Sequence, residues 1–255
     1  MKKILLKIFN RQNKIIKFLS IIKNIFFNFI QIGKISKRYA INLLPKLISS
    51  QIQVEKNREK IFKHKNYFER RYNFNYDDWF SHNIPIWEKY INNFLEIDYL
   101  EIGCFEGRST VYIGEIAKVK SITTIDTFKG GDEHSNINFD LVYNNFKKNI
   151  EKLDKKNIDV IDDLSDNFFK TNTKSFNLIY VDGSHHYKDV KNDFLNSFNV
   201  LKKDGIIIFD DFLWEYYENS KNNPMCAIIE VYKILKDNFK ILHVNNQVIF
   251  QKKNA

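Results

Sequence analysis

The stretch that decides the fold spans residues 98–126, DYLEIGCFEGRSTVYIGEIAKVKSITTID. It begins with a short apolar run, turns through Gly103 and Gly107, continues with a helical pattern, and ends in a second apolar run closed by Asp126. A strand, a glycine-containing loop, a helix and a second strand form the unit from which parallel sheets are built. Ligands bind at the carboxyl ends of such strands, where both glycines and Asp126 lie.

The same alternation of strand and helix continues to the end of the chain. Strands are predicted at residues 98–103, 121–126, 158–162, 176–182, 205–211, 239–244 and 247–252, and helices at 108–118, 139–153, 187–201 and 226–237. Several strands are apolar almost throughout, which is typical of a parallel sheet covered on both faces. The last two are joined by a short turn at Asn245 and Asn246 and must be antiparallel. We therefore predict an α/β fold, a Rossmann-like doubly wound, mostly parallel sheet of seven strands with an antiparallel last strand, over residues 96–255.

Charge is distributed unevenly along the 255 residues. Of the 40 Lys and Arg, 11 lie in residues 1–54, which contain no acid, so the remainder holds 29 basic and all 31 acidic side chains. The net charge of +9 therefore belongs to the N-terminal segment, which argues against nucleic acid as a partner of the α/β part. Cys104 and Cys226 lie far apart without metal-ligand spacing, and this favours a reducing, cytoplasmic location.

Residues 1–54 place apolar side chains in helical clusters separated by lysines, which predicts a basic amphipathic helical extension. Its longest uncharged run, residues 24–33, has ten residues, whereas a membrane-spanning helix needs about 20. We therefore expect no spanning segment, and Lys7 interrupts the first apolar run too early for a secretory signal. Two hypotheses stay open. Residues 1–50 contact the anionic inner surface of a membrane, or the helix packs on the main domain or on a second subunit.

Residues 55–95 are predicted to form a helical cap that is rich in aromatic side chains. One hypothesis places Trp79, Phe80, His82 and Trp87 around a substrate pocket. The other, which we favour because aromatic clusters are more often core, places them beneath a capping helix.

The first predicted strand of the α/β part leads into a loop suited to a cationic ligand. Gly103 and Gly107 would let the chain turn tightly and the backbone approach a ligand closely. The dinucleotide fingerprint is incomplete, because its third glycine is absent and Glu101 precedes the loop. An acid there would repel a pyrophosphate but suits a sulfonium amino acid with a free amine. Asp126, at the end of the second strand, can accept both ribose hydroxyls of a nucleoside.

These residues resemble the class I S-adenosylmethionine-dependent methyltransferases, and the resemblance covers residues 98–252 with their antiparallel last strand. It implies that the domain binds S-adenosylmethionine, with Glu101, Gly103 and Gly107 around the methionine part and Asp126 at the ribose. The alternative is a Rossmann-like domain that binds another nucleotide.

The resemblance also implies two further cofactor contacts. Ser109 lies where relatives bind the cofactor carboxylate, and Ser165 falls in the region that contacts adenine. Phe105 occupies the position of a middle glycine in many members, and the caffeoyl-CoA type tolerates phenylalanine there.

Three carboxylates are predicted to converge at the other side of the same sheet edge. The fourth strand ends at Asp182 and the fifth at Asp210 and Asp211, and a single crossover helix separates them, so the strands are expected to be neighbours. Without a counter-charge these acids would repel one another. A divalent cation with oxygen ligands, such as Mg²⁺, resolves the repulsion. The alternative is that Asp210 or Asp211 caps the following turn.

The run DGSHHY, residues 182–187, resembles the macrocin-type sugar O-methyltransferases and methyltransferase family 24, and more broadly the metal-dependent catechol and caffeoyl-CoA O-methyltransferases. The resemblance implies that Asp182, Asp210 and Asp211 bind Mg²⁺, and that Asp182 also borders the cofactor. His185 occupies the position of the catechol-type catalytic lysine and is implied as the base, because a neutral imidazole can accept a hydroxyl proton near pH 7. His186 is the alternative, with a helix-capping role as its other interpretation.

The segment DTFKGGDEH, residues 126–134, forms a polar loop just beyond the ribose acid. One hypothesis has this loop close over the cofactor or reach the acceptor, and the other leaves it an exposed turn.

The combined expectation is an S-adenosylmethionine-dependent, Mg²⁺-assisted O-methyltransferase acting on a hydroxyl of a small or sugar-like acceptor, such as a glycan or lipid-linked saccharide. A nucleic-acid methyltransferase is disfavoured because the basic charge is confined to residues 1–54. A non-enzymatic member that binds a cofactor or partner is disfavoured because the three acids and His185 are all present.

Overall fold

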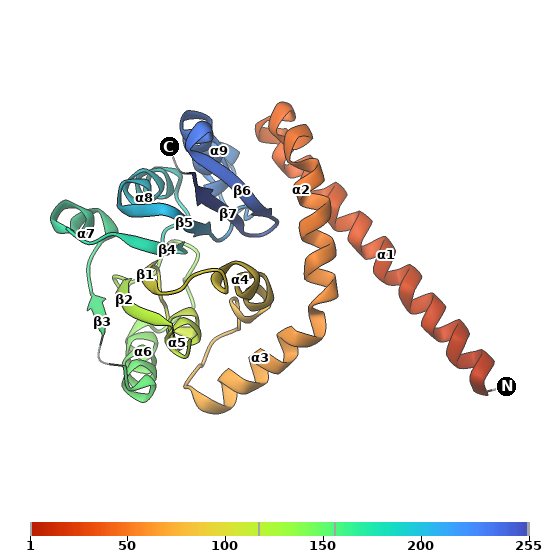
Figure 1. The fold of residues 1–255 in the computed structure, drawn as a ribbon, viewed down its shortest axis with the longest axis horizontal. Helices are drawn as coiled ribbons and strands as arrows, with labels where there is room; N and C mark the ends of the chain where they lie inside the picture. Colours follow the sequence, from red (N-terminus) through yellow and green to blue (C-terminus); the bar gives the residue numbers. More distant parts are fainter. Residues whose placement is uncertain (1, 117, 156, 254–255) are drawn as a thin grey trace.

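The computed structural model describes residues 2–116, 118–155 and 157–253, with side chains from residue 15 onward. The N-terminal part contains α1 (Lys2–Ile35), α2 (Lys37–Lys56), α3 (Arg58–Arg71), the 3-10 turn η1 (Ser81–Asn83) and α4 (Ile84–Ile91). The α/β part contains β1 (Ile97–Ile102), α5 (Arg108–Gly114), β2 (Val119–Ile125), α6 (Phe139–Leu153), β3 (Ile158–Ile161), α7 (Ser165–Thr171), β4 (Phe176–Val181), α8 (Tyr187–Val200), β5 (Leu201–Phe209), η2 (Ser220–Asn222), α9 (Pro224–Leu235), η3 (Lys236–Asn238), β6 (Phe239–Val244) and β7 (Val248–Lys252). Helices flank the sheet, while α1 extends away from it (Figure 1).

The seven strands form one sheet in the order β3-β2-β1-β4-β5-β7-β6. Neighbouring strands are parallel from β3 to β5, whereas β7 runs antiparallel to both β5 and β6. The predicted doubly wound sheet with its antiparallel last strand is therefore confirmed. Strand order reverses between β1 and β4, and β4 lies beside β5, so the ends of β1, β4 and β5 meet at one edge.

The central strands are mostly apolar because both faces of the sheet are covered. On one face, Leu100 and Ile179 pack in a core that α8 and α9 complete with residues such as Phe194. On the other face, Tyr99 and Tyr180 pack in a second core with residues of α3, α4 and α5. Each face thus buries alternate side chains of the same strands, which fixes their pairing register.

Several elements differ from the sequence prediction. Helix α5 ends at Gly114 and not at residue 118, and β2 begins at Val119 and not at residue 121. Helix α7, Ser165–Thr171, was not predicted, because seven residues are too few to display a helical period. Strand β5 begins at Leu201, four residues before the predicted start at residue 205, because residues 202–204 are exposed and polar and carry no apolar signal. Predicted strand 239–244 and predicted helix 139–153 have the bounds observed for β6 and α6.

The N-terminal extension consists of two helices that meet at Ser36, whose hydroxyl accepts a hydrogen bond from the Tyr39 amide. Helix α2 packs beside β6 through Ala40, Leu43 and Leu47, which are buried in the first core. The hypothesis that this segment packs on the main domain therefore holds for α2.

The segment Ile15–Ile35 of α1 has 21 residues and is, by length and composition, long and apolar enough to cross a membrane. Length and composition alone do not test whether this segment crosses a membrane, so the expectation that it does not span stays a prediction. Lys17, Lys23 and Lys34 interrupt the segment, but three charges in 21 residues do not make it polar on average.

The cap of residues 55–95 divides into buried and exposed aromatics. Trp87 is fully buried and donates from Nε1 to Gln247 Oε1 at 2.8 Å, and Phe80 packs edge-on against it. These two are core, as favoured from the sequence. Trp79 is 53% exposed and lines the cavity described below together with His82 and Phe80. The core interpretation therefore holds for Trp87 and Phe80, and the pocket interpretation is kept for Trp79 and His82.

Candidate active site

A cavity of about 850 Å³ opens at the carboxyl edge of the sheet, where the loops after β1, β2, β4 and β5 meet. It is lined by most of the residues singled out in the sequence. Those are Gly103, Ser109, Asp126, Ser165, Asp182, His185, Asp210 and Asp211, whereas Glu101 and Gly107 do not line it.

The loop after β1 is shaped by residues with positive φ. Gly103 has a φ of +84°, and a Cβ there would overlap the backbone of Asp182 and Gly183 in the loop after β4. Gly107 has a φ of +81°, and a Cβ would lie 2.9 Å from the Phe146 ring. Only glycine therefore lets the β1 and β4 loops touch. Phe105 has a φ of +49°, in the left-handed region that favours glycine.

Asp126 holds this loop in place. Its Oδ2 accepts hydrogen bonds from the backbone amides of Cys104 and Phe105 at 2.8 and 2.9 Å, and its Oδ1 accepts from the Phe128 amide. A carboxylate has about four acceptor positions, so one side of the group can still receive hydroxyl donors from the cavity.

Glu101 is fully buried beneath the loop. Its carboxylate accepts hydrogen bonds from the hydroxyls of Ser109 and Thr110. Burial raises the pKa of Glu101 to about 7, although these hydroxyls and that of Tyr99 lower it. The structure thus places Glu101 where it orients the start of α5, and Ser109 between Glu101 and the cavity.

The far end of the cavity contains a buried acid that the sequence did not single out. Ser165, at the start of α7, donates to Asp193 Oδ1 at 2.6 Å. Asp193 is 2% exposed, lines the cavity from α8, and has its pKa raised to about 7 by burial. Its position inside a predicted helix offered no signal of function.

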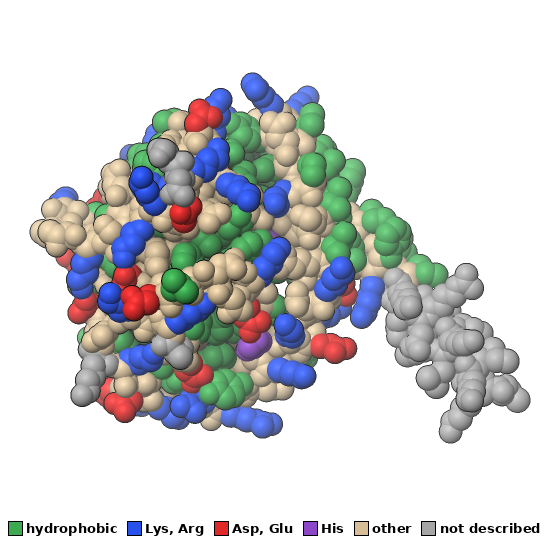
Figure 2. Space-filling model, in the orientation of Figure 1, with side chains coloured by type: hydrophobic (Ala, Val, Ile, Leu, Met, Phe, Trp, Pro, Cys, Tyr) green, Lys and Arg blue, Asp and Glu red, His purple; other side chains and the backbone are tan. Residues whose placement is uncertain are grey.

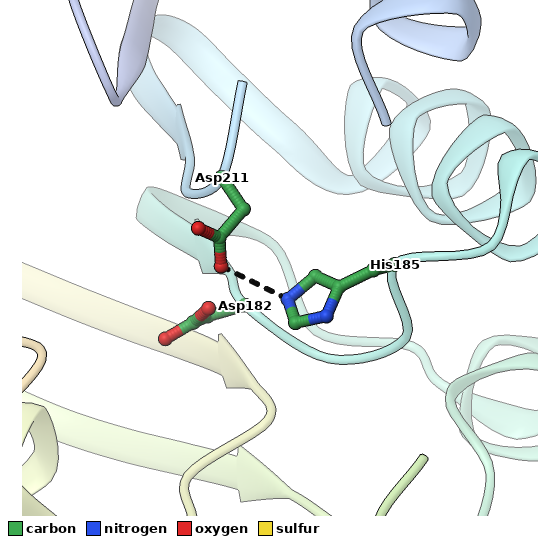
Figure 3. A group of neighbouring side chains, drawn as sticks. All are labelled: Asp182, His185 and Asp211. Carbon is green, nitrogen blue, oxygen red and sulfur yellow. Dashed lines mark ion pairs between the residues drawn. The ribbon is translucent and has the colours of Figure 1, made fainter. Parts of the chain in front are cut away.

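Asp182, His185 and Asp211 form the chemical centre of the cavity. One ligand atom from each lies within 4.8 Å of the others, and the two carboxylates lie on the same side of the imidazole ring (Figure 3). His185 Nε2 forms an ion pair with Asp211 Oδ2 at 3.0 Å. Asp211 has a φ of +50°, and backbone conformations of this kind in non-glycine residues concentrate at functional sites.

Burial together with Asp210 and Asp211 raises the pKa of Asp182 well above its ordinary value. Burial and Asp211 also raise the pKa of Asp210 to about 6. Three acids thus share a small volume at an electrostatic cost that a cation would relieve.

Asp210 differs from the other two acids in its partners. Its Oδ2 accepts from the Tyr180 hydroxyl at 2.5 Å and from Gln247 Nε2 at 2.8 Å, and its Oδ1 accepts from the Asp211 amide. It is not among the three residues whose ligand atoms cluster. Asp210 as a metal ligand stays a prediction.

His185 lies between two carboxylates. Its Nδ1 is 2.7 Å from Glu133 Oε1, from the loop after β2, while Nε2 faces Asp211. Burial lowers the pKa of His185, but the two carboxylates outweigh burial and raise it to about 10. The same contact with His185 lowers the pKa of Glu133 to about 2. The sequence had identified the loop 126–134 but not Glu133 as the partner.

His186 lies outside the cavity lining. Its ring packs edge-on against Tyr217, and its backbone carbonyl accepts from the amides of Asp189 and Val190 at the start of α8. The structure therefore separates the two histidines, and His185 is the one at the acid cluster.

The donor set fits a divalent cation. Asp182 and Asp211 supply hard oxygen ligands. His185 Nε2, a buried polar atom that makes no hydrogen bond of acceptable geometry, lies beside them. Carboxylates also accept Mn²⁺ and related ions.

Aromatic rings border the cavity near His185 and at the cap. Trp214, in the loop after β5, lies with its ring centroid 4.6 Å from that of His185, and Tyr216 stacks on it. Trp79 from the cap lies across the cavity beside Phe105 and His134. His134 and Glu133 line the cavity, so the loop 126–134 closes one of its sides.

The cavity is strongly acidic. Among the described residues that line it, twelve are Asp or Glu and Arg108 is the single Lys or Arg. Arg108 Nε lies 3.4 Å from Asp78 Oδ1 and its guanidinium lies over the Phe74 ring, so its charge is compensated. Such a cavity attracts cationic ligands and repels polyanions.

Known proteins resemble this chain in sequence and fold. Residues 100–212 match the methyltransferase domain model of methyltransferase family 24. An uncharacterised protein of Acanthamoeba polyphaga mimivirus is 26% identical over 174 residues, 64% of this chain and 75% of that protein.

Two solved structures share the fold. A protein of Staphylococcus aureus described as a candidate caffeoyl-CoA O-methyltransferase has a TM-score of 0.52 at 15% identity, over 81% of this chain and 100% of that chain. The O-methyltransferase from Bacillus cereus, in complex with SAH, has a TM-score of 0.50 at 13% identity, over 76% and 90%.

Proposed function

We propose that this chain, which belongs to the class I methyltransferases, transfers the methyl group of S-adenosylmethionine to a hydroxyl of a small or sugar-like acceptor. In this proposal a divalent cation such as Mg²⁺ assists the transfer. The observation that carries the proposal is that Asp182, His185 and Asp211 converge in the same cavity as the Gly103 loop. A methyl donor and a hydroxyl acceptor can therefore meet there.

The residues at the β1 and β2 ends fit the methyl donor. Gly103 lets the backbone approach it, and Asp126 has acceptor capacity left for ribose hydroxyls. Ser109 and Ser165 lie at the cavity wall toward the two ends of such a ligand. S-adenosylmethionine is a cation at its sulfonium and its amine, which suits a cavity rich in carboxylates.

The proton of the acceptor hydroxyl must be removed before the oxygen can attack a methyl group. His185 is the base in this proposal, but a protonated imidazole cannot accept a proton. A divalent cation held by Asp182 and Asp211 would lower the pKa of the acceptor hydroxyl and cancel the negative charge that keeps His185 protonated. His185, still oriented by Glu133 through Nδ1, would then present Nε2 to the hydroxyl.

The acceptor class follows from the walls of the cavity. Trp79 and Trp214 offer flat apolar faces, and the surrounding carboxylates offer hydrogen-bond acceptors. This combination suits a hydroxylated ring such as a sugar or a catechol. The twelve acids disfavour nucleic acid, whose phosphates they would repel.

Isothermal titration with S-adenosylmethionine, with and without Mg²⁺, followed by a methyl-transfer assay on a panel of sugars and catechols, tests the proposal. We expect donor binding, tighter acceptor binding with Mg²⁺, and S-adenosylhomocysteine release with at least one acceptor class. Absence of heat with the donor would exclude the methyltransferase activity. Donor binding without turnover on any acceptor would favour a non-enzymatic member of the family.

A further inference from the structure

Helix α1 exposes an unusual amount of apolar surface. Between Ile15 and Ile30, eight large hydrophobic side chains are 44–63% exposed, among them Phe18, Phe26 and Phe27. Hydrophobic side chains gather along the outer edge of the two N-terminal helices on the visible face (Figure 2). An extended apolar surface of this kind on a water-soluble chain indicates a contact with another molecule.

The exposed residues lie on one side of the helix. At 100° per residue, the eight fall within about half of the helix circumference, and Ile21, Ile25 and Asn28, which are less exposed, lie on the opposite half. On α2, Ile41, Ile48 and Ile52 are exposed at helical spacing. Both helices therefore present an apolar stripe beyond what the body covers.

Charge indicates the kind of partner. Residues 1–54 contain 11 Lys and Arg and no acid, and Lys17 and Lys23 are exposed on the same stretch of α1. Two such segments from two copies would bring like charges together, which disfavours their pairing. We propose that the apolar stripe of α1, together with that of α2, binds the surface of an anionic lipid bilayer, with its lysines at the phosphate groups.

The attachment of α1 to the body favours a helix that lies in the membrane surface. Asn28 Nδ2 donates to Asn245 Oδ1 and Gln31 Nε2 donates to Glu215 Oε2, both at 2.9 Å, and Ile32 is fully buried. The apolar segment is Ile15–Ile35, and its part ahead of Asn28 spans about 20 Å at about 1.5 Å per residue, less than the hydrocarbon thickness of about 30 Å. The helix continues toward the N-terminus to Lys2, but residues 2–14 carry five Lys and Arg and do not lengthen the apolar segment.

The attachment also places the membrane contact near the acceptor side of the cavity. Glu215 follows Trp214 in the loop after β5. It accepts the hydrogen bond from Gln31 and forms an ion pair with Lys34 at 3.5 Å. A lipid-linked acceptor would therefore be presented next to His185. This use of the contact rests on the proposed function, whereas lipid binding itself does not.

Flotation of the full chain with vesicles tests the proposal. We expect binding to vesicles of phosphatidylcholine and phosphatidylglycerol in equal parts, and weaker binding to pure phosphatidylcholine. Replacing three exposed rings together, Phe18→Ser, Phe26→Ser and Phe27→Ser, should weaken binding at least about tenfold. Lys17→Glu with Lys23→Glu should remove the preference for anionic vesicles.

The matched control carries three substitutions of exposed apolar residues elsewhere, Phe62→Ser, Leu95→Ser and Ile234→Ser, which are 70%, 95% and 67% exposed. It should bind vesicles like the wild type. Titration with S-adenosylmethionine on every variant shows whether the variant is still folded, which separates a lost membrane contact from a lost fold. It also distinguishes failure of the lipid-binding proposal from failure of the proposed methyltransferase activity.

Three outcomes would overturn the proposal. One is vesicle binding that the triple phenylalanine variant retains. Another is absence of vesicle binding together with a wild-type dimer in sedimentation that the variant converts to a monomer, which would assign the stripe to a second copy. The third concerns orientation. A fluorophore on Phe26→Cys, in a Cys226→Ser background, should be quenched at shallow depth, and quenching at the bilayer centre would overturn the in-plane helix.

Discussion

His185 Nδ1 lies 2.7 Å from Glu133 Oε1, although 52 residues separate the two in the chain. Glu133 follows β2 and His185 follows β4, so the contact joins the two loops across the end of β1. A carboxylate on Nδ1 fixes the tautomer and orientation of the ring and directs Nε2 toward Asp211 and the cavity. Glu133 thus orients the group proposed as the base.

Replacing the base should abolish the reaction without disturbing donor binding. His185→Ala is expected to lower kcat by at least about 100-fold, the usual contribution of a positioned base. Titration with S-adenosylmethionine should give the wild-type affinity, because Asp126 and the Gly103 loop are untouched. His186→Ala is the matched control and should turn over normally. Wild-type turnover by His185→Ala would remove His185 from the mechanism.

Replacing the orienting carboxylate should give a milder loss with a different signature. Glu133→Gln keeps the shape of the side chain but removes a charge that raises the pKa of His185. We expect kcat to fall about 10- to 100-fold, as for partners of metal ligands and bases, and the His185 pKa measured by NMR to fall. Glu133→Asp should restore part of the rate. An unchanged His185 titration in Glu133→Gln would refute the pairing.

The sequence was sufficient to predict the sheet because the residues of its central strands form recognisable apolar runs. Continuous apolar runs such as Leu178–Val181 can only be buried on both faces, and strand–helix alternation then dictates parallel crossovers. The meeting of Asp182 and Asp211 followed from the same logic, since adjacent parallel strands end at one edge.

Features that depend on loops folding over one another were not predictable. Nothing in the local pattern around Glu133 shows that it reaches His185, and Glu101 was placed at the ligand although its side chain is buried under the loop. Asp193 has the helical spacing of a core position and only the fold reveals that it borders the cavity. The contact of α1 with Glu215 likewise joins segments that lie far apart in the chain, and no local sequence pattern indicates that they meet.

The contact between the β1 and β4 loops predicts that Gly103 tolerates no side chain. Gly103→Ala would place a Cβ against the backbone of Asp182, in a left-handed conformation, and should cost about 3 kcal/mol or more in the free energy of unfolding. Gly33→Ala is the control, because that glycine lies inside α1 with the Ala40 Cβ 3.9 Å from its added atom. It should stabilise the chain by about 0.5–1 kcal/mol. Equal denaturation midpoints for the two variants would contradict the prediction.

The two neighbouring acids after β5 should contribute unequally to cation binding. Asp211→Asn removes a ligand atom of the clustered group and is expected to weaken Mn²⁺ affinity, followed by titration calorimetry, at least about tenfold. Asp210→Asn removes an acceptor of the Tyr180 and Gln247 bonds and should mainly lower stability. If Asp210→Asn abolishes Mn²⁺ binding as well, the carboxylate of Asp210 must turn toward the ion, as the sequence resemblance implied.

The stability of the protein without cations should depend on pH through His185. The pKa of this histidine is raised from its ordinary 6.5 to about 10, so the folded state retains a proton that the unfolded state releases. The resulting stability is complete below pH 6.5 and is lost as pH rises toward 10. Glu101 and Asp193 have folded pKa values of about 7. Most of their effect on the pH dependence of the free energy of unfolding therefore lies below pH 7.

Between pH 7 and 9 we therefore expect the free energy of unfolding, measured by urea denaturation with chelator, to fall by up to about 1.4 kcal/mol per pH unit. His185→Gln should be less stable at pH 7 because Asp211 and Glu133 lose their counter-charge, but its stability should fall less steeply than that of the wild type over this range, since only the wild type also loses the His185 proton. Saturating Mn²⁺ should also flatten the wild-type profile, since the ion replaces the imidazolium as the partner of Asp211. Parallel slopes for wild type and variant would show that His185 does not hold its proton between the two carboxylates.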